Sequence, residues 1–471
     1  MKMVNSLKLR GRMLLLIVSA VFVPGLKAAE TIDIGIGTQD TTTNTVTAGV
    51  VIKNLGLLDK YLPHSGKYQG VKYNITWLNA TSGPPITNSM IAGKLQIGMM
   101  GDYPLLVNGA TGQQLGNNSE LVAVIAYNRY GSGNGIVVPK DSPYYDIADL
   151  KGKVVSVPFG SAAHGMVVNA LAERGLPPDY FKLISQSPEV GSTSLQEKRI
   201  DAHADFVPFP ELLSYRGIGR KIYDGAETGI PTFHGIVVRK DFAQKYPEVV
   251  VGYLKAVLAA DQWLKANPIQ AAEKIEQWTK IDKEVAYIYL GPDGIHTLDS
   301  TIKPILVDAL KKDYALLRKM NLVKELNIDA WVNDRYIKQA YQEMGMDYAK
   351  QLKSFDNYGV KGFDPECKVA ITDQRLVGQI LMKDGELVSY SSPDCTFAAL
   401  SKTPSAQVDT VYLIDHTRQI KVFASNAFYN VNTVNGKKVI TPFMLKGDAQ
   451  AFTDKNGGKL EGYQDVLDNK S

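Results

Sequence analysis

The pattern of hydrophobic and polar positions between residues 31 and 242 changes type roughly every 10–15 residues. Short β-type runs alternate with helical stretches: Ile32, Ile34 and Ile36 alternate as in a strand, and residues 71–77 do so again. Further strands are predicted at 95–100, 121–127, 135–138, 154–157 and 235–239, and helices at 82–92 and 161–175. Strands that alternate with helices indicate an α/β fold with mainly parallel sheets.

The chain becomes helical after residue 242. Pro247 is placed to begin a helix whose apolar face carries Val250, Leu254 and Val257, and Asn267-Pro268 ends it. Helical patterns continue through 269–280, 305–320 and 329–352.

A third pattern begins near residue 363. Lys383-Asp384-Gly385 and Asn435-Gly436 each separate two β-type runs, and both fit tight hairpin turns with positive φ. A helical piece follows at 447–454. The segment 363–471 is therefore predicted to be a separate small α+β domain.

The length of 471 residues already favours at least two domains, because single cores stop growing near ~250–300 residues. Residues 1–28 have a basic start, an apolar run from Met13 to Val23, and small residues after Pro24-Gly25, which is the layout of a secretory signal peptide. That run falls short of the ~20 residues that span a bilayer. The alternative is an uncleaved N-terminal anchor. No later segment is long and apolar enough to cross a membrane, so we expect an exported chain.

The charge balance changes with this assignment. Residues 1–28 carry five positive charges and no acid, so without them the formal net charge of +4 becomes −1. A near-neutral mature chain gives no electrostatic reason to bind nucleic acid.

Familiar catalytic motifs are absent from the sequence. It contains no GxSxG, Walker loop, HExxH or CxxC, and we expect no enzymatic activity. The glycine-rich run Gly131–Gly135 has the wrong spacing for a phosphate loop and is predicted to be a flexible crossing between two lobes.

Small polar residues follow several of the predicted strands. In an open parallel sheet the carboxyl ends of the strands line a common crevice where ligands bind. Free N–H groups at the helix starts after Ser82 and Ser161 are suited to a polar or negatively charged ligand group, although both serines also fit a role as ordinary helix caps.

Four stretches resemble one known family: Ser82–Gly98, Asp149–Val157, Gly160–His164 and Asp201–Asp205. Together they resemble the nitrate/sulfonate/taurine-type solute-binding proteins of ABC importers, over about residues 31–350. The resemblance implies a two-lobed periplasmic-binding-protein fold of type II, with lobe 1 at about 30–130 and 236–355 and lobe 2 at about 131–235. It also implies a periplasmic protein that closes on a small ligand and delivers it to an ABC permease with its ATPase. Carried over by position, the ligand contacts are Gln39, Asp40, Ser82, Gly83, Asp102, Ser161, His164, Asp205 and His234.

The charge of that ligand stays open. Asp40, Asp102, Asp205 and Glu211 are acidic, and Arg129 is the only obvious cation near a crossing, so an amine-bearing, zwitterionic or cationic ligand fits at least as well as an anion. Three histidines, at 164, 203 and 234, fall in turns that can face the crevice. They offer zinc or copper ligands, or simply hydrogen bonds. Some relatives of this fold make a pyrimidine precursor of thiamine, but in the cytoplasm, which a signal peptide argues against.

The final segment matches a second family at Gly378–Glu386, Tyr390–Phe397, Val411–Asp415, Thr441–Phe443 and Asn456–Gly458. These runs resemble NosL-type copper accessory domains, over roughly residues 363–468. The resemblance implies Cu(I) held by soft sulfur ligands, with Cys367, Cys395 and Met382 or Met444 as candidates. The family's Cys-Gly-Met run is missing, since Lys368-Val369-Ala370 follows Cys367. The competing interpretation is a disulfide, which two cysteines 28 residues apart in an exported domain commonly form.

The sequence therefore predicts the solute-binding component of an ABC importer with a NosL-like C-terminal domain. The alternative is a periplasmic copper- or metal-handling protein that uses both the cleft and the last domain.

Overall fold

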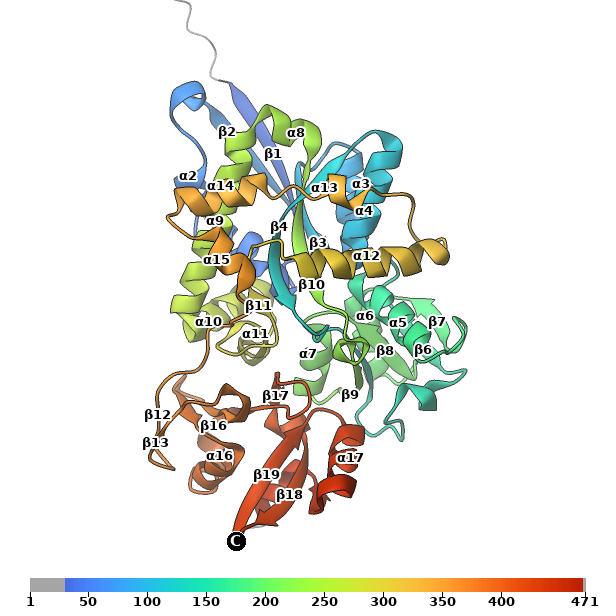
Figure 1. The fold of residues 1–471 in the computed structure, drawn as a ribbon, viewed down its shortest axis with the longest axis vertical. Coiled ribbons are helices and arrows are strands. Elements are labelled where there is room, and N and C mark those ends of the chain that lie inside the picture. The colour runs from blue at the N-terminus through green and yellow to red at the C-terminus, as the bar shows by residue number, and fades with distance from the viewer. Residues whose placement is uncertain (1–29, 469–471) are drawn as a thin grey trace, which may run out of the picture.

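The computed structural model describes residues 30–468. The predicted signal peptide lies outside the described residues. Two α/β lobes, each built on its own sheet, stand above a smaller C-terminal domain in Figure 1.

The first lobe contains a six-stranded sheet in the order β11-β4-β10-β3-β1-β2. Its strands are β1 (Thr31–Thr38), β2 (Lys72–Asn79), β3 (Ile97–Gly101), β4 (Ser119–Asn128), β10 (Thr232–Arg239) and β11 (Thr297–Leu298). The helices from the first part of the chain are η1 (Thr43–Ala48), α1 (Val50–Asn54), α2 (Leu57–Tyr61), η2 (Gly66–Tyr68), α3 (Gly83–Ile91) and α4 (Asp102–Leu115). The later ones are α8 (Lys240–Lys245), α9 (Pro247–Ala266), α10 (Pro268–Thr279), α11 (Lys283–Leu290), α12 (Pro304–Lys319), α13 (Ile328–Trp331), α14 (Arg335–Glu343) and α15 (Tyr348–Lys353).

The second lobe contains a five-stranded sheet in the order β7-β6-β8-β5-β9. Its strands are β5 (Gly135–Pro139), β6 (Val154–Val157), β7 (Lys182–Ser185), β8 (Ala202–Asp205) and β9 (Gly219–Asp224). Its helices are η3 (Ile147–Leu150), α5 (Ala162–Glu173), α6 (Pro188–Gln196), α7 (Phe209–Tyr215) and η4 (Gly225–Thr228).

The expectation of mainly parallel sheets needs correction, because both sheets are mixed. β1 is parallel to β2 and β3, and β6 to β7 and β8, but β10 and β5 run antiparallel to both of their neighbours. The cause is the double passage between lobes: β5 and β10 are the strands that the chain enters directly from the other lobe.

The two crossings between the lobes lie side by side. Asn128 Oδ1 accepts the backbone N–H groups of Tyr130, Gly131 and Ser132, which fixes the first crossing. Gly131 has φ +102°, and a Cβ there would lie 2.4 Å from the carbonyl oxygen of Ile230 on the second crossing. Only glycine therefore fits at this position.

Helices α9, α10 and α12 confirm the predicted segments to within one or two residues. The helical pattern over 329–352 is instead divided into α13, α14 and α15. Two features interrupt it: the backbone N–H of Asn333 bonds to the Leu121 carbonyl of β4, and Gly345 adopts φ +67° after α14. Helix α11 was not predicted.

The C-terminal domain has two main small sheets, β15-β14-β16-β17 and β19-β18-β20, and a β12-β13 hairpin. Its strands are β12 (Phe363–Asp364), β13 (Val369–Ala370), β14 (Gly378–Met382), β15 (Leu387–Tyr390), β16 (Val408–Ile414), β17 (Lys421–Phe423), β18 (Phe428–Val434), β19 (Lys437–Phe443) and β20 (Lys459–Glu461). Its helices are η5 (Gln374–Leu376), α16 (Pro393–Leu400), η6 (Ser405–Gln407), η7 (Ala424–Asn426), α17 (Lys446–Asn456) and α18 (Tyr463–Asp468). Both predicted hairpin turns are confirmed, and Asn435 and Gly436 have the positive φ values of +52° and +77°.

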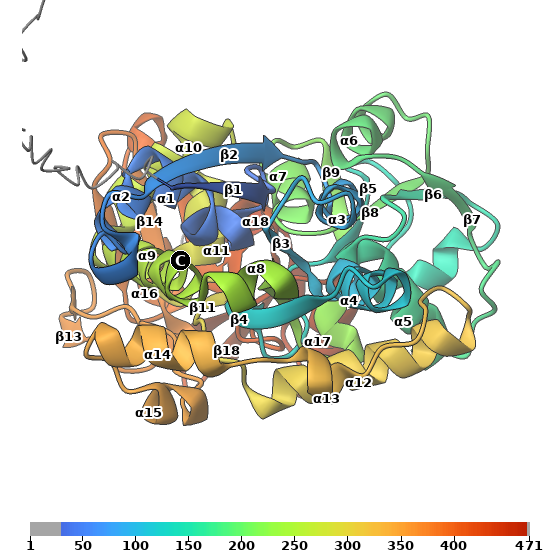
Figure 2. The same cartoon turned by 90° about the horizontal axis from the view of Figure 1, so that it is seen from above.

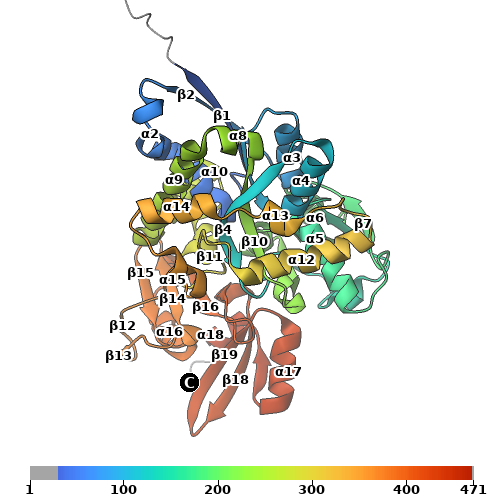
Figure 3. The ribbon, with the colours of Figure 1, turned by 45° about the horizontal axis from the view of Figure 1, so that its top comes forward.

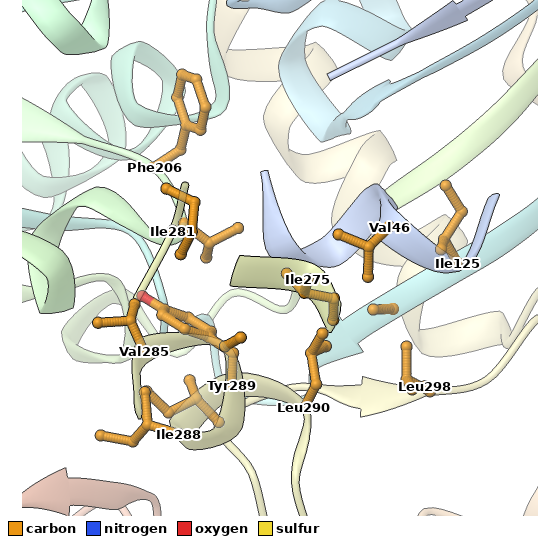
Figure 4. Close-up of a cluster of buried hydrophobic side chains, with 14 of the residues drawn as sticks. Val46, Ile125, Phe206, Ile275, Ile281, Val285, Ile288, Tyr289, Leu290 and Leu298 are labelled. Atoms are coloured by element: carbon orange, nitrogen blue, oxygen red, sulfur yellow. The ribbon is translucent and has the colours of Figure 1, made fainter. Parts of the chain in front are cut away.

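Buried apolar side chains form one continuous cluster that runs through both lobes into the C-terminal domain. Figure 4 shows part of it, with Val285, Ile288 and Tyr289 of α11, Ile281 just before that helix, Val46 of η1 and Phe206 of the second lobe. Among residues 30–468, no helix is both long and apolar enough to cross a bilayer.

Candidate ligand-binding site

The carboxyl ends of β1, β2, β3 and β6 meet where the two lobes touch, and the lobes are in direct contact there. A Cβ at Gly101 of the first lobe would lie 3.0 Å from the Ala162 Cβ of the second. One at Gly165 would lie 3.3 Å from the Cβ of Tyr103. The lobes are therefore closed on each other along the starts of α4 and α5.

The turn after β1 buries side-chain oxygens that have no hydrogen-bond partner within residues 30–468. These are Gln39 Oε1, Thr42 Oγ1 and Thr43 Oγ1, and all three residues are at most 2% exposed. Thr45 Oγ1, by contrast, donates to the carbonyls of Gln39 and Thr42 and holds the turn in shape. Leaving a buried polar group unpaired costs about 1–3 kcal/mol, so this turn is built to pair with polar groups from outside the chain.

A chain of buried hydrogen bonds links this turn to the second lobe. The Asn44 amide lies 3.4 Å from His234 Nδ1 and 2.7 Å from His296 Nδ1, and His296 Nε2 lies 2.7 Å from the Ser132 carbonyl oxygen at the crossing. Burial lowers the pKa of His234 to about 3 and that of His296 to about 4. Both rings are therefore neutral at physiological pH.

A small polar cavity of about 30 Å³ lies between the lobes, lined by Asp102, Asp313, Asn169, Thr228 and Thr232 among others. Asp102 accepts from Thr232 Oγ1 at 2.6 Å, and Asn169 of α5 donates to Asp313 of α12 at 2.8 Å. The second of these bonds ties the lobes together; Figure 2 shows α12 extending along the first lobe toward α5. Burial raises the pKa of Asp102 to about 6, and burial together with the charge of Asp102 raises that of Asp313 to about 8.

These raised pKa values predict that the protein loses stability as the pH rises. A carboxyl group whose pKa is higher in the folded state contributes its full stabilisation below its unfolded pKa of about 4, and loses it as the pH passes the folded pKa. For Asp313 that window runs from about pH 4 to about pH 8. Asp313→Asn keeps the oxygen that accepts from Asn169 and removes the ionisation. Urea unfolding across this range should show a flatter pH dependence for Asp313→Asn than for the wild type, and Asp308→Asn on the same helix is the control.

The remaining predicted contacts occupy different environments. Asp40 and Ser82 are partly exposed, and Gly83 is packed against Pro104. Ser161 Oγ accepts from the His164 backbone N–H at 3.3 Å and so caps α5, whereas Ser82 makes no cap bond.

Two further predicted residues are held by neighbours within the second lobe. His164 stacks on Phe159 with ring centroids 4.9 Å apart, and burial lowers its pKa. Asp205 is fully buried, and its two oxygens accept from His203 Nε2 and the Phe206 N–H, both at 2.8 Å. Its carboxylate is therefore already paired inside the lobe.

Sequence reasoning missed Thr42, Thr43, Asn44, Asp313 and His296. For the first three a signal was present, because the polar run Thr41–Thr45 directly follows Gln39-Asp40 at the end of the first strand. Asp313 and His296 come from the helical part of the chain and reach the interface only through tertiary packing.

A second cavity of about 350 Å³ opens between α5 and the end of α12. Its lining is mostly apolar, with Val167, Leu171, Leu183 and Leu316, and His164 is its one residue from the predicted contact set. It lies on the side of α5 next to the polar cavity of Asp102 and Asp313.

In the C-terminal domain the two cysteines form a disulfide, with a Cα–Cα distance of 5.8 Å. Asp364 lies beside them; its carboxylate and the two sulfurs are all within 4.8 Å of one another. Met444 lines a different cavity, together with Phe423 and Lys421, at the contact with the second lobe. Met382 ends β14.

The two sheets and the paired crossings define the two-lobed α/β fold of periplasmic binding proteins. Among solved structures, the fold is similar to the alkanesulfonate-binding protein SsuA from Xanthomonas axonopodis pv. citri bound to MOPS, with a TM-score of 0.55, 22% identity, and coverage of 65% of this chain and 100% of that one. It is also similar to the periplasmic nitrate-binding protein NrtA from Synechocystis PCC 6803, with a TM-score of 0.53, 16% identity, and coverage of 70% and 92%.

The chain belongs to the NMT1-like family, whose model matches residues 27–279, more than half of its length. It is 32% identical to the taurine-binding periplasmic protein of Escherichia coli over 41% of this chain and 58% of that protein. It is also 25% identical to a putative aliphatic sulfonates-binding protein of Bacillus subtilis, over 58% and 80% of the two chains. The chain thus spans less than two thirds of the taurine-binding relative.

Proposed function

We propose that this protein is the periplasmic solute-binding component of an ABC importer. It captures a small polar organic solute by closure of its lobes and delivers it to a membrane permease. The observation that carries the proposal is the buried turn of unpaired oxygens after β1, which lies at the end of the strand where ligands bind in such sheets. The NMT1-like family and its sulfonate- and taurine-binding relatives support the same role.

The groups around the turn indicate the class of solute. The Thr42 and Thr43 hydroxyls can donate hydrogen bonds to the oxygens of a sulfonate or a similar polar group, whereas Gln39 Oε1 accepts and suits an N–H group of the solute. Asp40 directly follows Gln39 in the chain, and Asp102 lines the cavity between the lobes, so the site also suits a solute that carries an amine. A sulfonate-, nitrogen- or amine-containing solute of a few heavy atoms fits both features.

Isothermal titration of the full chain with taurine, ethanesulfonate, MOPS, nitrate and ethylamine tests this proposal. We expect saturable binding of at least one of them at one site, with thermal stabilisation of about 2.7 kcal/mol at a hundredfold excess over Kd. The absence of both binding and stabilisation for the whole panel would contradict it.

A metal-handling role is the second candidate, and the cluster of Asp364, Cys367 and Cys395 is the observation that favours it. The resemblance of this domain to NosL-type copper accessory domains points in the same direction. The disulfide occupies both sulfurs, so Cu(I) binding here requires reduction first. Copper titration before and after reduction separates this role from solute binding.

A further inference from the structure

The C-terminal domain touches both lobes at once. In Figure 1 it lies below α11 of the first lobe on one side and below α7 and β9 of the second lobe on the other, and in Figure 3 it again lies below the lobes. A domain that contacts two lobes restricts the movement of one lobe against the other. How far it does so depends on how strongly the domain is held by each lobe.

The contact with the first lobe is buried and hydrogen-bonded. Tyr412 OH donates to the Glu284 carbonyl at 3.2 Å, and Tyr287 OH donates to Gln379 Oε1 at 3.1 Å. Lys421 Nζ donates to the Pro292 carbonyl at 2.6 Å. Tyr287, Tyr412 and Lys421 are each 1% exposed. Breaking this contact would expose the buried Tyr287 and Tyr412 rings to water, so the domain is fixed to the first lobe.

The contact with the second lobe is lighter. We call its four C-terminal residues, Arg418, Phe423, Asn426 and Lys446, the latch residues. Phe423 packs on Tyr215 with ring centroids 5.1 Å apart, and Asn426 Nδ2 donates to the Ser214 carbonyl at 3.2 Å. Arg418 lies 3.7 Å from Glu227, and the Lys446 ammonium lies 4.0 Å from the ring centroid of Tyr145.

This second contact is also incompletely packed. A cavity of about 40 Å³ lies between Ser214, Arg220 and Lys221 of the second lobe and Phe423, Asn426 and Met444 of the domain. The ring and cation–π contacts between the domain and the second lobe each contribute about 1 kcal/mol. The Arg418–Glu227 pair, with side chains 8% and 22% exposed, adds little net stability, because both charges regain their hydration when the lobes part. The contact with the second lobe is therefore the one that separates first when the lobes move apart.

We propose that the C-terminal domain is an intramolecular latch. It moves with the first lobe and engages the second lobe only when the lobes are closed. Such a contact, made in one of two states, shifts the population toward that state even without ligand. It therefore raises the closed fraction of the free protein and slows opening. Lobe closure is part of the proposed function, but the latch depends on geometry and not on which solute binds.

The test is the double variant Asn426→Asp/Lys446→Glu in the full chain without ligand. Its new carboxylates face the Ser214 carbonyl and the Tyr145 ring and repel both. The matched control is Asn435→Asp/Lys455→Glu, which makes the same charge change at exposed positions away from the lobes. Small-angle X-ray scattering should show a larger radius of gyration for the latch variant only. Hydrogen exchange in α7 should rise about tenfold in the latch variant only.

Equal radii and equal exchange in the latch variant and the control would overturn the latch. Because these measurements use no ligand, they test the latch independently of the titrations that test solute binding.

Discussion

Replacing Thr43 by valine is expected to make the ligand-free protein more stable and solute binding weaker. The Thr43 hydroxyl is buried without a partner, so a methyl group of similar size removes a desolvation penalty of about 1–3 kcal/mol. If the hydroxyl pairs with the solute, its loss should weaken binding about tenfold. Urea unfolding measures the first effect, and titration with the solute selected from the panel measures the second.

The opposite signs of the two effects make this substitution informative. Thr433→Val on the exposed part of β18 is the matched control and should change neither quantity by much. If Thr43→Val destabilises the free protein, the hydroxyl has a structural partner. If it stabilises the protein and leaves binding unchanged, the turn does not contact the solute.

Removing the disulfide should produce the largest loss of stability that a side-chain substitution causes in the C-terminal domain. The bridge joins cysteines 28 residues apart, and loop closure of that size is worth about 3–4 kcal/mol in the chain-entropy model. Cys367→Ser/Cys395→Ser should therefore lower the unfolding free energy of residues 363–468 by about that amount, measured by hydrogen exchange in β14 and β16. An unchanged exchange rate there would contradict this prediction.

The oxidation state of the same two cysteines determines whether the C-terminal domain can bind Cu(I). Oxidised protein should compete poorly with bathocuproine disulfonate for Cu(I), whereas protein reduced and handled anaerobically should compete if the metal-handling role is correct. Asp364→Asn keeps both thiols and tests whether the carboxylate takes part. Equal competition by the reduced wild type and the reduced double serine variant would remove the metal role from this domain.

Local patterns in the sequence predicted the elements whose ends carry clear proline, glycine or asparagine signals. Pro247 and Asn267-Pro268 bound α9 because proline fits the first turn of a helix and not its interior, and Asn435-Gly436 forms a tight turn because both residues accept positive φ. The helical pattern over 329–352 gave one helix where there are three, since the break at Asn333 comes from a bond to β4, more than two hundred residues earlier. The direction of β5 and β10 likewise depends on the passage between lobes, which local periodicity does not encode.

The candidate site was only partly accessible from the sequence. Gln39 was predicted as a ligand contact, because polar residues at the end of a strand are visible as a pattern in the sequence. Thr42 and Thr43 lie in the same polar run. Asp205 shows the limit of that reasoning: it follows a strand as expected, but its carboxylate is paired with His203 and a backbone N–H inside the lobe. His296 and Asp313 lie on segments that are far away in sequence, and only packing brings them to the interface.

The continuous apolar cluster has a practical consequence for how this chain can be divided. Tyr287 and Ile288 of α11 share one cluster with Tyr412 and Val422, so cutting the chain near residue 355 exposes an apolar face of the first lobe to water. The shortened protein would carry an exposed hydrophobic patch and tend to self-associate. The domain boundary predicted near residue 363 therefore divides a single hydrophobic cluster.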